Sequence, residues 1–589
     1  MKKTLTLLFI SGMLAAGTLH ADETLTVDQE KGIDSTELLN ISNITQEGNW
    51  AASRYLQRIK KADTVWQGTS GEAVNYSDNT VINTESYGSR AGVLALESDN
   101  YYKAENVPGL TIQGFGDISF DRNTTTSYRA EQGGVVYIVG EADRTSADYA
   151  HAVSGLSINN NGTVSFDANS VTANDRTAYG GAMHMGARST VEITGNDKVS
   201  FNDNKLNATK NYAYGGAVYL TGNTNRTADL SVSGNVDVSF SGNAVTASNY
   251  VYGGAISSQA NTNVAIEGNT GKVDISNNSV ALASSSGTIR GGAIYSEKGA
   301  TLSIAGNKEV IFAGNYEKTG DTYRLRSIYS VESSSSSDSG VKLSAAADGK
   351  IEFRDSVYIQ GNVKLNDAYG DEAQTGKIIF TGRTTESDLN AVIAANTAEG
   401  ETARVATANE IALSRTSDIT GSITLHNGTL SLQDDAVLKA TELIIKEGAT
   451  LEGSRTNEEI AMVFAMSAED EAVLDSVASL NADLVLEDGA ILNMVGGSID
   501  LNGKALTMGS NIQVSYTGNA AEGEEVVLFK NVGSTDATEY ELTLNGKTTT
   551  ATLSDGNVVV EYTASVPEPT TATLSLLALA ALAARRRRK

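Results

Sequence analysis

Two short motifs return along the central part of the sequence at a nearly constant interval, and this regularity constrains the fold more than any other feature. The first motif is a glycine pair followed by small or aliphatic residues, and successive copies begin 47, 35, 38 and 38 residues apart. The second motif places an asparagine three residues after a phenylalanine, and its copies alternate with the glycine pairs. A repeat of this length is typical of a solenoid, in which each repeat stacks on its neighbours.

The motif residues define the candidate structural sites of the chain. The glycine motif consists of Gly133, Gly134, Gly180, Gly181, Gly215, Gly216, Gly253, Gly254, Gly291 and Gly292. The second motif consists of Phe120, Asn123, Phe166, Asn169, Phe201, Asn204, Phe240, Asn243, Ile275, Asn278, Phe312 and Asn315, with Ile275 in place of phenylalanine in one degenerate copy.

The segments between the motifs indicate which kind of solenoid the chain forms. "AVYLTG", "DLSVSGN" and "VDVSFSGN" alternate apolar and polar residues at period two and end at glycine or asparagine, as short β-strands do. Aromatic residues make up 6% of the chain and glycine contributes 57 residues, which favours a repetitive core of small and β-branched side chains. We therefore predict an all-β fold, a right-handed parallel β-helix with an N-terminal cap and a C-terminal β cap.

Each motif residue has an expected mechanical role in such a coil. The phenylalanines are expected to point inward and stack as a ladder, whereas the asparagines are expected at corners, where they tolerate a left-handed backbone and bond neighbouring amides. The glycine pairs permit a positive φ or a close approach of two coils. Tyr179, Tyr214 and Tyr252 each precede a glycine pair, which predicts a second, shorter ladder.

The chain divides into six predicted segments. Residues 1–21 precede an N-terminal cap at 22–104, which contains Trp50 and Trp66 and covers the open end of the solenoid. The repeat motifs occupy 105–339, and tighter regular coils are expected at 340–505, with one short helix opening on Ser467. A C-terminal hairpin cap at 506–565, with turns at "NG" and "DG", precedes the tail at 566–589.

The N-terminal end reads as a signal for export. Residues 1–21 have a positively charged start, a short apolar stretch and small residues before a cleavage site at Ala21. These features predict a secretory signal peptide recognised by the Sec export machinery.

The C-terminal end reads as a sorting signal. Pro567, Glu568 and Pro569 precede an apolar run of 11 residues and the five cations of "RRRRK". The run predicts a short transmembrane helix, although it is shorter than the roughly 20 residues that a full crossing needs. This tripartite tail resembles the PEP-CTERM sorting signal, which implies an exosortase-like sorting enzyme as a partner and a Gram-negative type envelope.

The repeats themselves resemble a second family. "GGAI" and "GGAV" alternating with "SFxxN", together with "LTIQGFGDISFDRN" and "VKLSAAADGKIEFRDSVYIQGN", are similar to the polymorphic outer-membrane proteins and related β-helical autotransporter passengers. The resemblance covers about residues 105–455 and implies a surface passenger used in adhesion or display. Those proteins end in a membrane β-barrel, for which no room is left after residue 455, so we expect the sorting tail to take the anchoring role.

Composition and the polar residues exclude several functions. A net charge of −27 disfavours nucleic-acid binding, and the lack of cysteine excludes disulfides and thiolate chemistry. No motif predicts a cofactor or a metal site, although calcium held by acids at loop corners stays open. Three groups are catalytic candidates that we interpret as structural: the histidines His151, His184 and His426, the pair Asp434–Asp435 in a solvent-facing turn, and the arginines of the "DR" pairs, Arg122, Arg144 and Arg176, which suggest local ion pairs.

Two functions remain after these exclusions. The favoured hypothesis is an exported, non-enzymatic surface protein that acts as an adhesin or as a surface or matrix component, with a glycan or protein ligand of unknown identity. A shield against immune recognition would have the same sequence features, so the sequence does not separate it from this hypothesis. The alternative is a glycan-active β-helix enzyme, a lyase or hydrolase, which requires clustered acidic and basic side chains in a groove.

Overall fold

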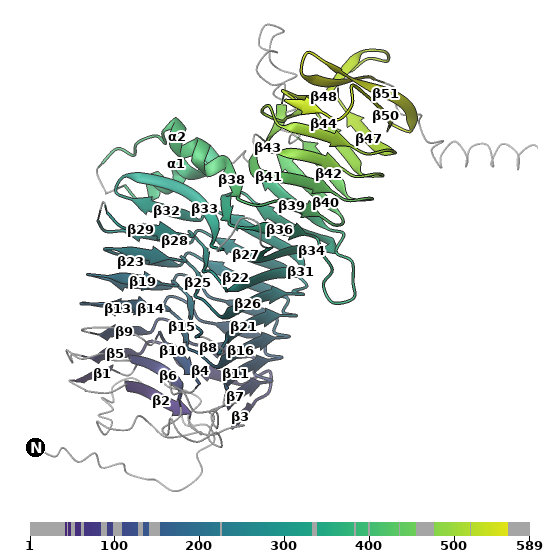
Figure 1. Ribbon diagram of the computed structural model, residues 1–589. Coiled ribbons are helices and arrows are strands. Elements are labelled where there is room, and N and C mark those ends of the chain that lie inside the picture. The colour runs from purple at the N-terminus through teal and green to yellow at the C-terminus, as the bar shows by residue number, and fades with distance from the viewer. Residues whose placement is uncertain are drawn as a thin grey trace, which may run out of the picture.

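The computed structural model describes residues 42–562, with gaps at 44, 49–53, 60–63, 84–90, 98–108, 128–133, 141–152, 224–225, 285, 333–337, 382–384, 398–400, 435, 455–475 and 519. The chain forms a long stack of coils whose short strands pair in parallel with the equivalent strands of the next coil (Figure 1). This arrangement is a parallel β-helix, so the predicted fold is confirmed. The predicted signal peptide with Ala21, the sorting tail, Gly133, Trp50 and the helix opening on Ser467 lie outside the described residues.

Three ladders of parallel strands run along the stack. The first ladder contains β2 (Arg54–Ile59), β6 (Ala91–Glu97), β10 (Val136–Val139), β15 (Met183–Met185), β20 (Val218–Leu220), β25 (Ile256–Ser258), β30 (Ile294–Ser296), β33 (Thr322–Ser330), β35 (Ser356–Ile359), β38 (Thr416–Ile419), β41 (Val437–Ile445), β43 (Ser476–Leu486), β45 (Ser498–Asp500) and β48 (Glu525–Lys530). The second contains β3 (Thr64–Gln67), β7 (Gly109–Gln113), β11 (Ser154–Asn159), β16 (Ser189–Thr194), β21 (Ala228–Ser233), β26 (Thr262–Glu267), β31 (Thr301–Ala313), β34 (Asp338–Phe353), β36 (Asn362–Leu365), β39 (Ile423–Leu425), then β41 and β43 again, β46 (Ala505–Met508) and β49 (Ser534–Thr535). The third contains β4 (Ala73–Asn75), β8 (Asp117–Ser119), β12 (Thr163–Ser165), β17 (Lys198–Ser200), β22 (Asp237–Ser241), β27 (Lys272–Ser276), β31, β34, β37 (Lys377–Thr381), β40 (Thr429–Gln433), β42 (Thr450–Ser454), β44 (Ile491–Val495), β47 (Ile512–Thr517) and β50 (Glu539–Leu544).

The repeat region carries two further sets of strands that the later coils lack. The fourth ladder contains β1 (Thr45–Gly48), β5 (Thr80–Asn83), β9 (Thr124–Ser127), β13 (Ser170–Ala173), β18 (Lys205–Ala208), β23 (Ala244–Ala247), β28 (Ser279–Leu282) and β32 (Tyr316–Thr319). A separate outer sheet contains β14 (Ala178–Tyr179), β19 (Tyr212–Tyr214), β24 (Tyr250–Tyr252) and β29 (Thr288–Arg290). The outer sheet comes from the segments between each Phe-x-x-Asn motif and the following glycine pair.

Coil length differs between the two regions. In the repeat region, paired residues of successive coils lie 34 to 47 positions apart, as between Leu230 and Val264 or Val136 and Met183. In the later coils the separation falls to 21 residues between Leu430 and Leu451. Coils of 21 and 22 residues therefore occur in the region predicted to be tighter, the second between Leu492 and Val514. Other pairs in this region lie farther apart, with 52 residues between Ile378 and Leu430 and 41 between Leu451 and Leu492.

Two helices interrupt the region predicted as regular coils at 340–505, which corrects that expectation. They are α1 (Thr385–Ala395) and α2 (Ala408–Arg415), inserted between β37 and β38. A capping box begins α2, because the Thr407 hydroxyl accepts a hydrogen bond from the Glu410 amide while the Glu410 carboxylate accepts one from the Thr407 amide. This Thr-x-x-Glu pattern was the overlooked sequence signal.

The helices cover the edge at which the fourth ladder ends. β32 and the first half of β33 form an antiparallel hairpin there, which would leave the outer amides of β33 unpaired. Glu410 Oε1 accepts from the Tyr323 amide at 2.8 Å, and Ser414 Oγ accepts from the Leu325 amide at 3.0 Å. Leu389 packs against the same hairpin in a small apolar cluster. The insertion therefore terminates one ladder while the other three continue.

Both ends of the stack depart from the predicted boundaries. Strands in residues 45–97, assigned to an N-terminal cap, already pair in parallel with the following coils, so the coiled region begins before residue 105. Trp66 is buried and stacks 6.0 Å from Tyr76 within that stack. Parallel pairing also continues into the predicted C-terminal cap through β46 and β47.

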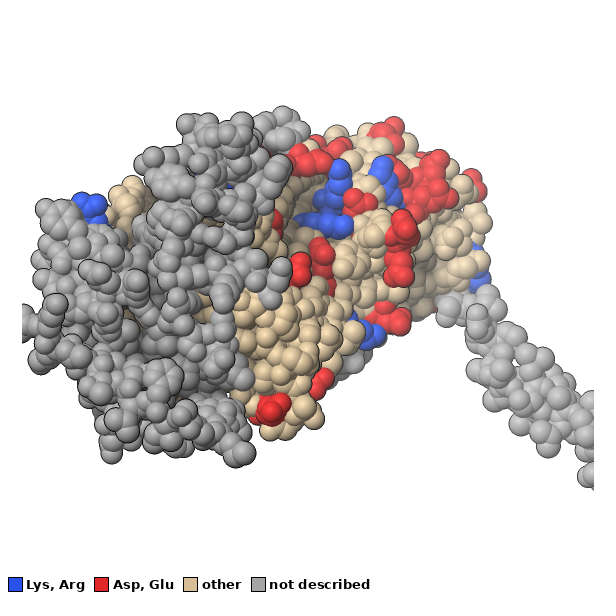
Figure 2. All heavy atoms as spheres, turned by 90° about the horizontal axis from the view of Figure 1, so that it is seen from below, with Lys and Arg blue, Asp and Glu red and all other residues tan. Residues whose placement is uncertain are grey.

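The C-terminal end closes with an antiparallel sheet. β50, β51 (Lys547–Ser554) and β52 (Asn557–Glu561) form a meander, and β52 returns to pair with β48. The predicted turns are present, since Asn545, Gly546, Asp555 and Gly556 all have positive φ. On the face shown in Figure 2, acidic side chains are spread over the coil surface, basic side chains lie among some of them, and broad areas carry neither.

Candidate functional site

The predicted phenylalanine ladder is confirmed. The rings of Phe120, Phe166, Phe201 and Phe240 are fully buried, and successive centroids lie 4.6 to 5.0 Å apart with nearly parallel planes. Ile275 occupies the next position in register. The ladder then resumes with Phe312 and runs on through residues that the motif does not include, Phe353 and Phe380. These side chains fill the core and are not available for chemistry.

The asparagines bond neighbouring amides at the coil corners, as expected, but they do not themselves adopt the left-handed backbone. The left-handed residue is the one before each asparagine, as at Asp203 and Gly242, while the asparagine itself is fully buried. Asn204 Nδ2 donates to Asn243 Oδ1 at 2.9 Å and to the Phe166 carbonyl at 2.8 Å. The same oxygen of Asn243 accepts from the Asn204 amide at 3.1 Å. Each asparagine thus satisfies polar backbone groups inside the coil corner and bonds the next asparagine.

This first asparagine ladder begins before the predicted motifs and ends on an acid. Its members are Asn79, Asn123, Asn169, Asn204, Asn243, Asn278 and Asn315. Asp355 replaces the next asparagine and accepts four hydrogen bonds, including those from the Asn315 amide and Ser327 Oγ at 2.9 Å. Burial raises the pKa of Asp355 to about 6, against the opposing effect of these donors.

The structure contains a second asparagine ladder, which the two sequence motifs do not predict. Its members are Asn161, Asn196, Asn235, Asn269 and Asn307, each bonded to the next by a side-chain amide at 2.8 to 3.2 Å. Gly195, Gly234, Gly268 and Gly306 precede four of them with positive φ. The signal was a Gly-Asn dipeptide after β16, β21 and β26 and within β31, which recurs at nearly the same interval as the two recognised motifs.

The two glycines have separate functions in the four pairs that begin at Gly180, Gly215, Gly253 and Gly291. The first of each pair adopts positive φ, with +74° at Gly215 and +66° at Gly253. The second lies against the next coil, since a Cβ on Gly216 would stand 1.9 Å from the Gly254 carbonyl oxygen. Gly181 and Gly254 face the same obstacle at the same distance. Both predicted functions of glycine are therefore present, at different residues.

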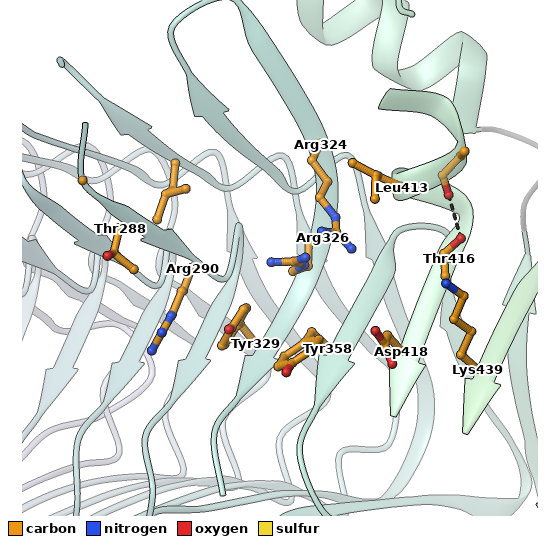
Figure 3. Close-up of a pocket in the computed structure, with 13 residues that line it drawn as sticks. Thr288, Arg290, Arg324, Arg326, Tyr329, Tyr358, Leu413, Thr416, Asp418 and Lys439 are labelled. Atoms are coloured by element: carbon orange, nitrogen blue, oxygen red, sulfur yellow. Dashed lines mark hydrogen bonds between the residues drawn. The ribbon is translucent and has the colours of Figure 1, made fainter. Parts of the chain in front are cut away.

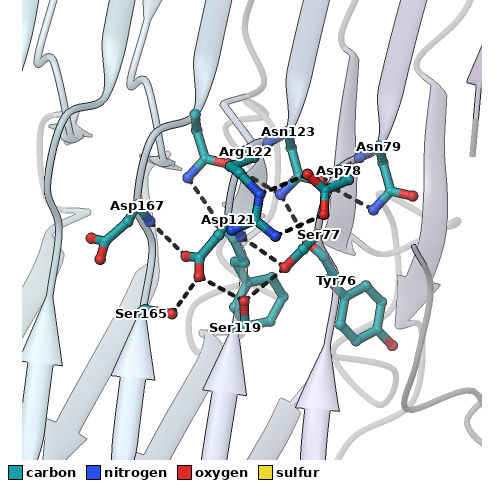
Figure 4. Close-up of polar contacts among 12 residues, drawn as sticks. Tyr76, Ser77, Asp78, Asn79, Ser119, Asp121, Arg122, Asn123, Ser165 and Asp167 are labelled. Carbon is teal, nitrogen blue, oxygen red and sulfur yellow. Dashed lines mark hydrogen bonds and ion pairs between the residues drawn. The ribbon is translucent and has the colours of Figure 1, made fainter. Parts of the chain in front are cut away.

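Acidic side chains in the repeats bond to the coil turns. Asp121 Oδ1 accepts from the Asp167 amide at 2.7 Å, while its Oδ2 accepts from Ser119 and Ser165 hydroxyls (Figure 4). Arg122 pairs with Asp78 at 2.7 Å, as predicted for its "DR" motif. Arg176 is exposed and Arg144 lies outside the described residues. Stacked carboxylates in this region therefore serve the fold.

The structure also shows the surroundings of two histidines and of one residue of the aspartate pair. His184 is 6% exposed and lies among Tyr137, Tyr179 and Tyr219, with centroids 5.0 to 5.4 Å away. His426 is half-buried, and His151 lies outside the described residues. Asp434 is 3% exposed with φ of 52°, so the expectation of a solvent-facing turn is wrong for this residue. Asp435 lies outside the described residues.

The predicted tyrosine ladder is one half of a larger seam. Tyr179, Tyr214 and Tyr252 lie in register on the outer sheet, and Tyr219 and Tyr295 project from the first ladder toward them. The two rows interdigitate, with Tyr179 4.7 Å from Tyr219 and Tyr252 4.5 Å from Tyr295. Burial raises the pKa of Tyr295 to about 12. We call these five residues the tyrosine seam.

The seam opens into a cavity where the outer sheet ends. At β29, Arg290 occupies the register position that tyrosine holds in the preceding strands. A cavity of about 620 Å³ follows, between the outer sheet, the first ladder and α2, and we call it the basic pocket (Figure 3). Its lining residues are Gly287, Thr288, Ile289, Arg290, Arg324, Arg326, Tyr329, Tyr358, Ala412, Leu413, Thr416, Asp418 and Lys439.

The arginines of the basic pocket are held in different ways. Arg326 is 6% exposed, and its Nη1 donates to both carboxylate oxygens of Glu317 at 3.0 Å. Arg290 lies over the Tyr329 ring, 4.9 Å from its centroid. Burial, together with the charge of Arg326, lowers the pKa of Arg324 to about 10. Nε of Arg324 and Nε of Arg326 are both buried without a hydrogen-bond partner among the described residues.

The basic pocket is not apparent from the sequence, because its lining residues come from coils distant in sequence. Two signals were present. "TYRLRS" places two arginines two positions apart, hence on one side of a strand, and "TIRGG" has arginine where the three preceding repeats have tyrosine. Among the residues that the structure describes, no group of three or more His, Asp or Glu side chains is arranged to hold a metal ion.

One comparison with known proteins identifies a part of the chain. Residues 565–589 match the family description PEP-CTERM protein-sorting motif. No curated protein and no solved structure matches the chain. The motif indicates a bacterial protein that is exported and sorted to the cell surface, where an exosortase-type enzyme processes it. Within the described segments, no helix has the length and hydropathy needed to span a membrane.

Proposed function

We propose that this protein is a non-enzymatic β-helical adhesin, or a structural component of the cell surface or matrix. The observation that carries the proposal is the use made of the repeated polar residues. Asn204 and Asn243 donate and accept within the coil stack, and Asp121 is bonded to the turn of the next coil. Because these polar side chains bond one coil to the next, they favour a structural function, in which a rigid stack of coils presents a surface to its surroundings.

The sorting motif supports the cellular side of this proposal. A chain that is exported and sorted to the surface can act on ligands outside the cell, and a stack of coils carries its far end away from the attachment point. We further infer that residues 1–21 direct export through the Sec machinery and that cleavage follows Ala21. Mass spectrometry of the mature N-terminus checks the cleavage, and a retained Met1 would refute it.

A second candidate, a glycan-active enzyme, is motivated by the basic pocket. Hydrolysis of a glycosidic bond ordinarily requires two carboxyl groups, roughly 5 to 9.5 Å apart. Asp418 is the one carboxylate among the described lining residues. The nearby Glu317 does not line the pocket and forms an ion pair with Arg326. This composition favours binding over hydrolysis.

Cell fractionation with surface proteolysis tests the proposed location, and a sugar-release assay tests the proposed lack of catalysis. We expect protease added to intact cells to degrade the protein, while a cytoplasmic control protein stays intact. The purified chain is expected to release no reducing or unsaturated sugar from acidic or neutral polysaccharides. Protection from protease would refute surface display, and sugar release would establish the enzyme instead.

A further inference from the structure

The basic pocket gathers positive charge on a strongly acidic protein. The whole chain has a net charge of −27, yet Arg290, Arg324, Arg326 and Lys439 line one cavity together with a single carboxylate, Asp418. Positive charge concentrated in one cavity of an acidic protein attracts anions that the rest of the surface repels. The basic pocket is therefore suited to an anion.

Arg324 is the group that most needs a partner. Glu317 neutralises Arg326 from behind, at 3.0 Å to both of its oxygens, but no described carboxylate bonds Arg324. The Nε of Arg324 is buried without a hydrogen-bond partner among the described residues. A guanidinium in this state gains most from a planar anion that accepts two hydrogen bonds, as a carboxylate does.

The remaining lining indicates more than a simple anion site. Tyr329 and Tyr358 lie 4.6 Å apart on adjacent strands, and Asp418 and Lys439 follow Tyr358 in the same register (Figure 3). Aromatic faces pack against sugar rings, while Asp418 can accept from hydroxyl groups. A volume of about 620 Å³ is within the range of small-ligand sites, roughly 300 to 1,000 Å³.

We propose that the basic pocket binds a sugar residue that carries a carboxylate, as part of an acidic glycan. Arg324 pairs with the carboxylate, Tyr358 packs against the ring, and Asp418 accepts from a ring hydroxyl. An inorganic anion satisfies the arginine alone and is opposed by Asp418. The choice of a glycan rests on the proposed surface role, whereas the preference for a carboxylate rests on the pocket.

Titration calorimetry with the purified full chain tests the proposal. The probes are a galacturonate tetramer and sialyllactose as two sources of a sugar carboxylate, with a neutral maltotetraose and a glutamate tetrapeptide as comparisons. We expect at least one acidic sugar to bind at least tenfold more tightly than maltotetraose and the peptide. The affinity is expected to fall as salt increases.

Matched substitutions locate the binding. Arg324→Gln is expected to weaken binding of the acidic sugar at least tenfold, and Lys439→Glu, at an exposed position, about threefold to tenfold. Arg354→Gln makes the same chemical change outside the basic pocket, where Arg354 pairs with Glu352, and should leave the affinity unchanged. Circular dichroism of each variant confirms that the fold persists.

Each contrary result has a defined meaning. Equal binding of maltotetraose, unchanged affinity in both Arg324→Gln and Lys439→Glu, or no binding of either acidic sugar at millimolar concentration would overturn the proposal. Tighter binding of the glutamate peptide would replace the glycan by an acidic peptide. None of these outcomes bears on surface proteolysis, so failure of the basic pocket and failure of the proposed surface role are distinguishable.

Discussion

The coils at residues 154–313 and those at 429–517 stack in the same way but satisfy their corners differently. The longer coils bury two asparagine ladders and a phenylalanine ladder. The shorter coils bury Leu430, Leu451 and Leu492 in register, and Gly448 turns their chain in solvent. A longer coil folds polar backbone inward at its corners, which requires buried partners. Among the described residues of the shorter coils, the buried polar side chains are those of Ser431, Asp434 and Ser498.

The largest expected effect separates the two regions by their glycines. Gly216→Val places a side chain 1.9 Å from a backbone oxygen of the next coil, so it should cost more than about 4 kcal/mol of stability. Gly448→Ala in the shorter coils meets no atom within 4 Å, and only its φ of +72° opposes it, at about 1 kcal/mol. Urea unfolding compares the two variants. Equal losses would show that coil contact does not explain the glycine pairs.

Breaking the asparagine ladder is expected to have the next largest effect. Asn243→Ala removes the acceptor of the Asn204 amide and the donor to the Phe201 carbonyl at 2.7 Å, at a cost of about 3 kcal/mol. Asn493→Ala in the shorter coils loses one half-buried bond to Glu452, at a cost below about 1 kcal/mol. The urea midpoints of the two variants provide the test. An unchanged midpoint in Asn243→Ala would mean that water replaces the hydrogen bonds to the Asn204 amide and the Phe201 carbonyl.

The helical insertion should respond to acid more strongly than the shorter coils, where burial opposes ionisation of Glu452 but hydrogen bonds, chiefly from Lys377, also lower its pKa. Burial opposes ionisation of Glu410, but hydrogen bonds from Arg404, Thr407 and the Tyr323 amide outweigh it and lower its pKa to about 2. The folded pKa lies below the unfolded value, so this stability is complete above about pH 4.5 and is lost as pH falls toward 2. Hydrogen exchange in α2 should therefore accelerate over that range before exchange in β44.

Glu410→Gln gives the matching change at neutral pH. It removes the charge paired with Arg404 and should weaken docking of α2 by about 2 kcal/mol. Glu487→Gln, in the exposed pair with Lys446 of the shorter coils, should cost below about 1 kcal/mol. Hydrogen exchange in each variant measures both effects. Unchanged protection of α2 in Glu410→Gln would contradict the assigned role of this carboxylate.

The smallest expected effect concerns the ring ladder. Phe240→Ile should cost about 1 kcal/mol, because Ile275 already occupies the next position in register. Leu451→Phe inserts a ring between two leucines of the tighter coils and should cost about 2 kcal/mol through overpacking. Thermal unfolding compares them. A larger loss for Phe240→Ile would show that stacking itself carries stability beyond the volume filled.

Periodicity predicted most of the backbone because every coil repeats the same demands. Phe201 and Phe240 were placed correctly, and so were the turns at Asn545–Gly546 and Asp555–Gly556. The sequence motif did not predict that the asparagines are buried, because it does not show which of two neighbouring residues adopts the left-handed backbone. The short helix α2 was missed because its capping box lies in a segment assigned to strands on its general alternation.

The sequence alone determined the stack, since a spacing shared by glycine, phenylalanine and asparagine can be satisfied only when equivalent residues meet. Tertiary structure decided where that regularity stops. Arg290, Arg324 and Asp418 belong to different coils, and they meet only because one ladder ends, the outer sheet stops and α2 covers the edge. A local sequence pattern specifies contacts between neighbouring coils. A cavity at the end of a ladder forms because no further strand is added there, and a repeated pattern does not specify where the repeat ends.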